Sequence, residues 1–227
     1  MSIWARILDA IQALAAGESL GDVFARLRSV PELRVGFAIA VIGLGAKMAK
    51  ADGQVTRDEV TAFREVFQIA PEDEAAAARV FNLARQDVAG FEDYAKQVKA
   101  MYGNDCEPLC DLMDGLFHIA MADGEYHPRE DAYLARVADI FEISDRKFRA
   151  LRARYVPDAH PDPYDVLGVD PRDETATIKS AYRDLVRETH PDRMIARGVP
   201  EEAVRLATDR MVEINAAWEE IQAQRAA

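Results

Sequence analysis

Acidic side chains at two similar turns have the chemistry of a divalent-cation site. Each turn reads Ala-Asp-Gly and is followed by a Glu seven residues past the Asp. Carboxylate oxygens suit Ca²⁺ or Mg²⁺, so a cation site is predicted if the two turns converge. Its ligands would be Asp52, Glu59, Asp123 and Glu130, with Asp58 and Glu125 beside them. The spacing is not that of an EF-hand loop, and carboxylates near helix starts also act as caps, which is the simpler interpretation.

A second set of residues offers charge to a partner. Lys179, Arg183 and Arg187 recur every four residues, so on a helix they form one basic ridge. His190-Pro191-Asp192 follows directly, and Pro191 disfavours helical geometry at His190. The tripeptide is therefore expected to end that helix as a turn. Without this turn, the ridge would be interpreted as an ordinary solvated helix face.

Sequence patterns typical of enzymes are absent. The chain contains no glycine-rich phosphate loop, no Gly-x-Ser-x-Gly and no His-Glu-x-x-His. Cys106, Cys110 and His118 make a weak zinc set, because zinc usually takes four ligands from paired motifs. Two cysteines four residues apart are better explained as small, buried residues. We predict a protein that is not an enzyme and needs no cofactor beyond the candidate divalent cation.

Length, composition and charge narrow the class of protein. The chain has 227 residues, of which 49% are apolar and 30% charged, as expected for one large or two ordinary folded domains. Its net charge of −12 argues against nucleic acid as a partner. No secretory signal is present at the N-terminus. The longest uncharged run, Val35 to Ala46, is shorter than the roughly 20 residues of a membrane span, so a cytoplasmic protein is predicted.

Helical periodicity runs along nearly the whole chain, and no stretch alternates in the manner of a β-strand. We therefore predict an all-α protein with two domains. Its parts are a helical leader over 1–32, a helical domain over 33–155, a proline-rich linker over 156–161 and a C-terminal domain over 162–227. The prolines of the linker cannot continue a helix, because each lacks an amide donor.

The leader begins with an apolar stripe. Ile3, Ile7, Ile11 and Leu14 recur at helical spacing. Such a helix would either pack on the following domain or lie on a membrane surface. Few basic residues accompany it to attract anionic lipid. We predict packing on the domain, and peripheral contact with the inner membrane is the alternative.

The domain over 33–155 contains an internal repeat. Segments 47–59 and 118–130 each pass from an apolar helix through Ala-Asp-Gly into a new helix. Gly53 and Gly124 suit the left-handed position that ends a helix, and Pro128 suits the first turn of the next one. This arrangement resembles the TerB-like family, an all-helical fold with duplicated helical hairpins. The resemblance implies a connection to stress or tellurite responses without identifying a ligand.

The C-terminal domain is expected to form a helical hairpin with the turn at its tip. We predict a helix from Thr175 to about Thr189, a loop from Arg193 to Pro200 and a last helix from Glu201 to about Ala223. Their apolar positions are Ile178, Ala181, Tyr182 and Leu185 in the first helix and Ala207, Met211, Ile214, Trp218 and Ile221 in the second. With Tyr-Asp-Val-Leu-Gly-Val before them and Glu-Ile-Asn-Ala-Ala-Trp-Glu-Glu-Ile at their end, they resemble a J-domain over 162–222.

The resemblance implies a role for the residues that carry it. J-domains dock on a DnaK-type chaperone ATPase and stimulate its ATP hydrolysis, so no catalysis takes place on the J-domain itself. The residues implied in chaperone binding are His190, Pro191, Asp192, Lys179, Arg183, Arg187 and Arg193. A second tripeptide of the same sequence, His160-Pro161-Asp162, lies in the proline-rich linker with no basic helix leading directly into it. We interpret that copy as a chance occurrence.

A TerB-like domain followed by a J-domain is the order in DjlA-type co-chaperones. That family typically carries an N-terminal membrane span, which this sequence lacks. The resemblance therefore implies a co-chaperone whose TerB-like domain binds an unknown client or partner. The alternative is a stress-linked, metal-binding or sensing adaptor of TerB type in which the J-domain is secondary. Binding of Ca²⁺, Mg²⁺ or Zn²⁺ that is lost when Asp52 and Asp123 are both replaced would favour the alternative.

Overall fold

The protein is helical throughout the part of the chain that the structure describes. This computed structural model describes residues 3–27, 30–52, 66–67, 69, 74–86, 90–103, 105–122, 124–156 and 162–226. No strand occurs in these ranges, and the predicted all-α fold class is confirmed. None of the helices in these ranges has the length and apolar character that a membrane span requires.

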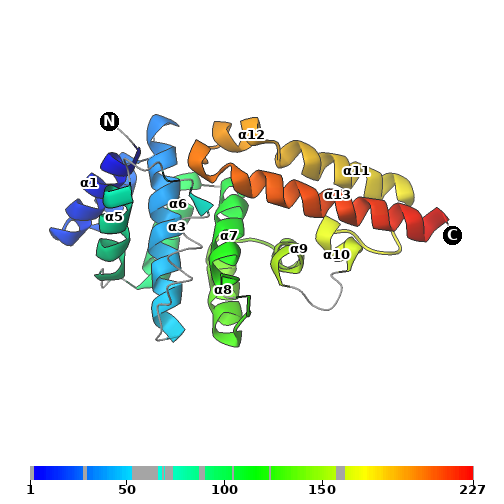
Figure 1. Ribbon diagram of the computed structural model, residues 1–227, viewed down its shortest axis with the longest axis horizontal. Coiled ribbons are helices and arrows are strands. Elements are labelled where there is room, and N and C mark those ends of the chain that lie inside the picture. The colour runs from blue at the N-terminus through cyan, green and yellow to red at the C-terminus, as the bar shows by residue number, and fades with distance from the viewer. Residues whose placement is uncertain are drawn as a thin grey trace.

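The helices before the linker surround one long central helix, α3 (Val30–Asp52). Around it lie α1 (Ile3–Ala15), α2 (Leu20–Arg26), α5 (Glu74–Gln86), α6 (Phe91–Tyr102), α7 (Glu107–Ala120), α8 (Pro128–Ile140) and α9 (Asp145–Tyr155). Helix α3 contacts α1, α5, α6, α7 and α8, and it stands between α5 and α7 in Figure 1. Its uncharged run, 35–46, is apolar on every side, and a helix of that kind is stable only when neighbours cover all its faces.

The leader helices belong to the same core. Trp4, Ile7 and Ile11 are buried, and α1 packs against α5 and α3. The Trp4 ring meets the edge of the Phe67 ring with centroids 5.8 Å apart. The stripe that the sequence places on α1 is therefore covered by the helical domain, as predicted.

The second Ala-Asp-Gly turn has the local structure expected of it. Gly124 has a φ of +81°, the left-handed conformation that glycine adopts without strain. Helix α8 begins at Pro128, and the Glu130 carboxylate accepts a hydrogen bond of 3.0 Å from the backbone N–H of His127. Glu130 thus caps α8. The corresponding first turn, 53–60, lies outside the described residues.

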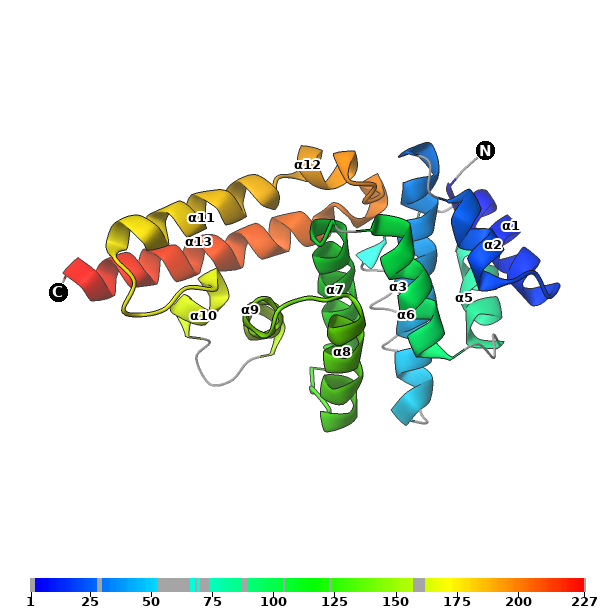
Figure 2. The same ribbon diagram turned by 180° about the vertical axis from the view of Figure 1, so that it is seen from behind.

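The C-terminal part forms the predicted helical hairpin. It consists of α10 (Pro163–Leu167), α11 (Thr175–Glu188), α12 (Pro191–Ala196), the short 3₁₀ helix η2 (Glu201–Ala203) and α13 (Arg205–Ala226). Helices α11 and α13 lie side by side along the long axis of the molecule (Figures 1 and 2). Their apolar faces bury Val166, Leu167, Val169, Ile178, Ile214, Ala217 and Ile221 in a core of their own.

The expected loop from Arg193 to Pro200 is wrong in its first half. Residues 191–196 form helix α12 instead, because Pro191 is favourable at the first position of a helix and His190 caps it. A loop and a 3₁₀ turn then lead to α13, which begins at Arg205 rather than at Glu201. The hairpin tip is therefore a rigid helical corner.

One face of the hairpin tip packs into the larger core. Met194, Val199, Ala203, Leu206 and Ala207 belong to the apolar cluster that also contains the buried residues of α3 and α7. Both views place the α12 end of the hairpin beside these two helices, whereas the C-terminus lies at the far end of the molecule (Figures 1 and 2). The two sequence domains are thus joined by a shared core at the tip, in addition to the linker.

Helix α3 approaches its neighbours closely at Gly43, which gives a first prediction. A Cβ at Gly43 would lie within 3.0 Å of two ring atoms and the hydroxyl oxygen of Tyr94, whereas a Cβ at Gly115 of α7 would meet Val41 at an ordinary 3.5 Å. We expect Gly43→Ala to lower the free energy of unfolding by about 1–3 kcal/mol through overpacking. We expect Gly115→Ala to raise it by about 0.5–1 kcal/mol, because alanine loses less entropy in a helix.

Urea denaturation of both glycine variants and the wild type measures these changes. The two substitutions add the same methyl group to the interior of a helix, so helix propensity alone would move both in the same direction. Equal stabilisation of the two variants would show that α3 and α6 are not in close contact at Gly43.

Candidate functional site

His190-Pro191-Asp192 lies at the corner between α11 and α12. The His190 imidazole caps α12, with Nδ1 accepting a hydrogen bond of 3.2 Å from the backbone N–H of Asp192. This bond requires an unprotonated Nδ1, which leaves Nε2–H as the donor for a partner. The His190 and Asp192 side chains are 57% and 87% exposed. The corner therefore holds the backbone in place and presents both side chains to solvent.

The basic ridge lies on the solvent side of α11. Lys179, Arg183 and Arg187 are all exposed, and so is Arg193 on α12. Arg187 Nη1 makes an ion pair of 2.9 Å with Asp184 Oδ1 on the same helix. Exposed pairs of this kind are weak, so the ridge remains available to an acidic surface.

The opposite face of α11 holds the ridge in position. Ile178 is fully buried, and the Tyr182 ring stacks on the Trp218 ring of α13 with centroids 5.1 Å apart. Tyr182 also donates a hydrogen bond of 3.0 Å from its hydroxyl to Asn215 Oδ1. These contacts prevent α11 from rotating about its axis, so the ridge keeps one direction relative to the corner.

The predicted cation ligands are not seen together. Glu130 caps α8, whereas Glu59, Asp123 and the side chain of Asp52 lie outside the described residues. No group of three or more His, Cys, Asp or Glu side chains with the arrangement of a metal site occurs within the described ranges. The cation site stays a prediction from the sequence.

The two cysteines lie at the start of α7. Cys110 is buried, and burial raises the pKa of its thiol to about 12, so in the absence of a metal the thiol is protonated at neutral pH. Cys106 lies directly before the helix without capping it through its side chain, and its Sγ is 3.4 Å from Lys147 Nζ and 3.7 Å from Glu107 Oε1. Both positions are explained by packing and by local polar contacts.

A buried ion cluster joins the two sequence domains beside the corner. Its members are Asp111 and Asp114 of α7, Arg154 of α9, Arg197 after α12 and Arg210 of α13. Arg197 donates two hydrogen bonds to Asp111 Oδ2, at 3.1 and 2.7 Å, and a third of 3.1 Å to the Glu188 carbonyl. Arg210 Nη1 bridges Asp114 Oδ2 at 2.8 Å and Asp111 Oδ1 at 3.3 Å. The cluster thus holds the C-terminal ends of α11 and α12 against α7.

Burial and charge act against one another in this cluster. The Asp111 and Asp114 side chains are 0% and 1% exposed. Burial raises the pKa of Asp111 to about 6, and Arg210 and Arg197 oppose that rise. Burial also disfavours the charged form of Arg210, but Asp114 and Asp111 outweigh it and hold the Arg210 pKa above its ordinary value. The pKa values of Asp111 and Arg210 therefore depend on their charged neighbours.

The sequence contains a signal for this cluster that the spacing analysis missed. Asp111 and Asp114 interrupt the apolar run between Glu107 and His118 of α7 and lie three residues apart, on one face. Arg210 takes a buried position of α13 next to Met211, which is only half buried. Charged residues at such positions are almost always paired. The two carboxylates of α7 therefore predict buried cations elsewhere in the chain, and Arg210 predicts a buried anion.

The linker copy of the tripeptide has a different setting. Asp162 caps the short helix α10 and accepts a hydrogen bond of 3.0 Å from the backbone N–H of Tyr164. His160 and Pro161 lie outside the described residues. Asp162 thus has a structural role at the start of the hairpin domain.

Comparisons with known proteins match two parts of the chain to known families. Residues 38–153 match the family described as Tellurite resistance protein TerB, and residues 162–226 match the DnaJ domain. The chain is 24% identical to Co-chaperone protein DjlA of Escherichia coli K12, with 99% of each protein covered. It is 28% identical to the protein of that name in Vibrio parahaemolyticus, over 80% of this chain and 74% of that one. No solved structure matches the chain.

Proposed function

We propose that this chain, which belongs to the TerB family and carries a DnaJ domain after its TerB domain, binds a DnaK-type chaperone and stimulates its ATP hydrolysis. The chain is a co-chaperone of DjlA type and not an enzyme. In the proposal, the TerB domain is the module that binds a client or partner. The DnaJ domain brings the chaperone to whatever the TerB domain holds.

One observation carries the proposal: the exposed His-Pro-Asp corner adjoins an exposed basic ridge on the same rigid hairpin. His190 and Asp192 expose their side chains while the backbone of the corner is held by the α12 cap. Lys179, Arg183 and Arg187 face solvent on α11. A ridge of one charge steers a partner of the opposite charge during encounter. The corner is then positioned to act on the bound chaperone.

Such an action shifts a conformational equilibrium and performs no chemistry. A partner that binds the hydrolysis-competent state of the chaperone more tightly increases the population of that state. The exposed imidazole and carboxylate of the corner can make contacts that exist in only one of the two states. Stimulation of ATP hydrolysis follows from this difference in affinity.

Single-turnover hydrolysis of ATP by a DnaK-type chaperone, with and without the full-length chain, tests the proposal. We expect the rate constant to rise with the concentration of the chain and to saturate. The absence of any stimulation by a chain whose circular dichroism shows a folded, helical protein would overturn the proposal.

Charge reversal on the ridge gives a second prediction. Arg183→Glu should raise the concentration of the chain needed for half-maximal stimulation by about fivefold, because it replaces an attraction with a repulsion at an exposed site. The rate at saturation should change little, because the corner is intact. The measurement is the same single-turnover assay at several concentrations of the variant and of salt.

Arg172→Glu is the matched control for the ridge. Arg172 lies in the same domain, between α10 and α11, and is 90% exposed, but it is not part of the ridge. The same change of charge there should leave the half-maximal concentration near the wild-type value. An equal effect at both positions would mean that the total charge of the domain, and not the ridge, determines docking.

A further inference from the structure

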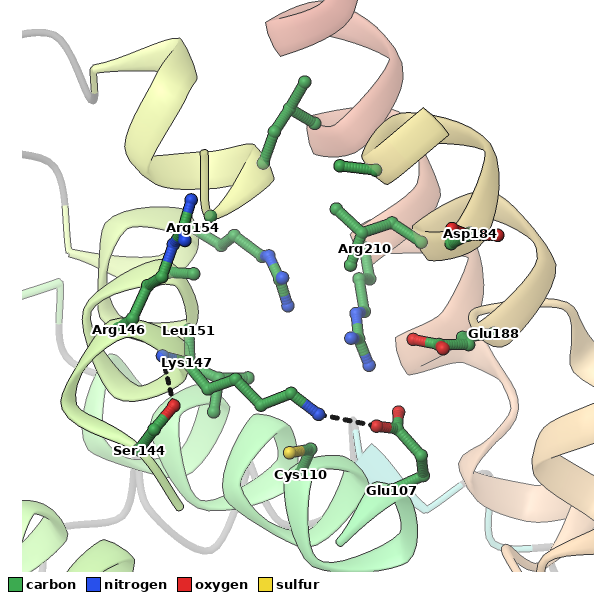
Figure 3. A pocket seen from close by; sticks show the side chains of 15 residues that line it. Glu107, Cys110, Ser144, Arg146, Lys147, Leu151, Arg154, Asp184, Glu188 and Arg210 are labelled. Atoms are coloured by element: carbon green, nitrogen blue, oxygen red, sulfur yellow. Dashed lines mark hydrogen bonds and ion pairs between the residues drawn. The ribbon is translucent and has the colours of Figure 1, made fainter. Parts of the chain in front are cut away.

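A pocket of about 370 Å³ lies between the TerB domain and the DnaJ domain. Its walls come from α7 and α9 of the TerB domain and from α10, α11 and α13 of the DnaJ domain (Figure 3). This volume is within the range of about 300–1,000 Å³ that small-molecule sites occupy. Neither the His-Pro-Asp corner nor the basic ridge lines it.

Arg154 points into this pocket with hydrogen-bond donors that no described residue accepts. Its side chain is 4% exposed, and Nε and Nη1 make no hydrogen bond. Its ion pair with Asp114 is long, at 3.7 Å. The guanidinium groups of Arg154 and Arg210 both reach toward the middle of the pocket (Figure 3), and Nε of Arg210 also has no hydrogen-bond partner within the described chain. Asp114 Oδ1 also makes no hydrogen bond, but it lies 3.7 Å from Arg154 Nη1. Buried donors are nearly always satisfied, and an acceptor inside the pocket would satisfy the two guanidinium groups.

The buried ion cluster itself has one anion fewer than it has cations. The buried ion cluster sets three guanidinium groups against the carboxylates of Asp111 and Asp114. Burial, followed by the nearby Arg210, lowers the pKa of Arg154 to about 10, so Arg154 is still charged at neutral pH. A buried charge without full compensation is costly. An anion in the pocket would supply the compensation.

Two of the three carboxylates that line the pocket are already paired. Glu107 forms an ion pair of 2.7 Å with Lys147, and Asp184 forms one of 2.9 Å with Arg187. The third, Glu188, lies across the pocket from Arg154 (Figure 3), and burial, followed by the charge of Glu107, raises its pKa. Glu188 is therefore the group that repels an anion in the pocket, and its removal should strengthen the binding of that anion.

Ser144, Arg146 and Lys147 also line the pocket, and another part of its wall is apolar. Leu151, Leu167, Ala181 and Leu185 line the pocket together with Ala150 and Gly168. An inorganic ion would leave this surface against water, whereas a molecule with a hydrocarbon body would cover it. Burial of such a body is favourable in proportion to the apolar area removed from water.

We propose that this pocket binds a small organic anion, with its carboxylate or phosphate group on Arg154 and Arg210 and its apolar body against the leucines. Ligands of this class would touch both domains at once. They would therefore stabilise the contact between the TerB domain and the DnaJ domain, since a ligand that binds only the folded, assembled form raises its stability by mass action.

Isothermal titration calorimetry of the full-length chain with four probes tests the class of ligand. The probes are hexanoate, hexyl phosphate, inorganic phosphate and 1-hexanol. We expect hexanoate or hexyl phosphate to bind, with the stronger of the two identifying the head group, and 1-hexanol not to bind. Binding of inorganic phosphate as strong as that of hexyl phosphate would overturn the role of the apolar wall. No binding of either organic anion would overturn the whole proposal.

Two variants with opposite expected signs locate the binding in this pocket. Arg154→Met keeps the length of the stem, removes the buried guanidinium and should weaken binding of the better probe about tenfold or more, the size of effect of a lost charge-assisted hydrogen bond. Glu188→Gln removes the opposing carboxylate and should tighten binding by about threefold. Loss of folding would move both affinities in the same direction.

Arg152→Met is the matched control on the same helix. Arg152 forms an ion pair of 3.0 Å with Asp131 and does not line the pocket, so its loss should leave the affinity unchanged. Equal weakening by Arg152→Met and Arg154→Met, or no tightening by Glu188→Gln, would show that the anion binds elsewhere on the surface.

Discussion

His190→Gln should abolish stimulation of the chaperone ATPase and leave the fold intact. Glutamine keeps an acceptor that can cap α12 in place of Nδ1, and the 57% exposed side chain contributes little to the core. What is lost is the imidazole with Nε2–H, which is the donor that the corner offers to a partner. Single-turnover hydrolysis at a saturating concentration of the variant should therefore proceed at the basal rate of the chaperone.

His160→Gln is the control for this experiment, because it makes the same change in the other His-Pro-Asp tripeptide. The linker copy is separated from the basic helix α9 by residues 156–159 and does not directly follow a helix as the corner does, so stimulation should equal that of the wild type. If both variants lose stimulation, the assay reports damage to the chain rather than the role of the corner. If His190→Gln stimulates fully, the corner is not the trigger and the proposed mechanism fails.

Asp111→Asn should lower the free energy of unfolding by about 3–5 kcal/mol, the usual cost of removing one partner from a buried ion pair. Asp111 is fully buried between Arg197 and Arg210. Its neutral replacement leaves Asp114 as the only carboxylate of the buried ion cluster against three guanidinium groups. Chemical denaturation of the full-length chain measures the loss, which corresponds to a fall in Tm of about 2–4 °C per kcal/mol for a chain of this size.

Asp93→Asn is the matched control for Asp111→Asn. Asp93 is 70% exposed and pairs with Lys96 on the surface of α6, so the same change there should alter the free energy of unfolding by about 0.5 kcal/mol or less. A small effect at both positions would show that Asp111 is protonated in the folded protein at the pH of the experiment. It would also mean that the cluster does not hold the domains together through charge.

The shared core has a consequence for the co-chaperone as a whole. Because α12 and the start of α13 bury Met194, Val199 and Leu206 with residues of α3 and α7, the His-Pro-Asp corner has one orientation relative to the TerB domain. A client or partner on the TerB domain would thus be held at a set position relative to the docked chaperone. This arrangement differs from that of a J-domain on a flexible tether, where only the length of the linker limits the position.

Local patterns in the sequence were sufficient to predict an all-helical fold, the buried face of α11 and the turn at His190-Pro191-Asp192, but not helix α12. The spacing of Ile178, Tyr182 and Leu185 predicts which face of α11 is buried, and the ridge of Lys179, Arg183 and Arg187 is exposed as expected. Helical periodicity and turn chemistry depend on residues within three or four positions of one another. They can therefore be recognised in one sequence without knowledge of any distant contact.

What only the tertiary structure decided depends on residues far apart in the chain. Asp111 meets Arg197 and Arg210 across 86 and 99 positions, and the pocket exists only where α7 and α9 face α10, α11 and α13. The sequence shows unpaired charges at apolar positions but not their partners, because pairing is a property of packed helices and not of spacing. The same holds for the position of the corner: its residues determine its shape, whereas the shared core determines its place on the molecule.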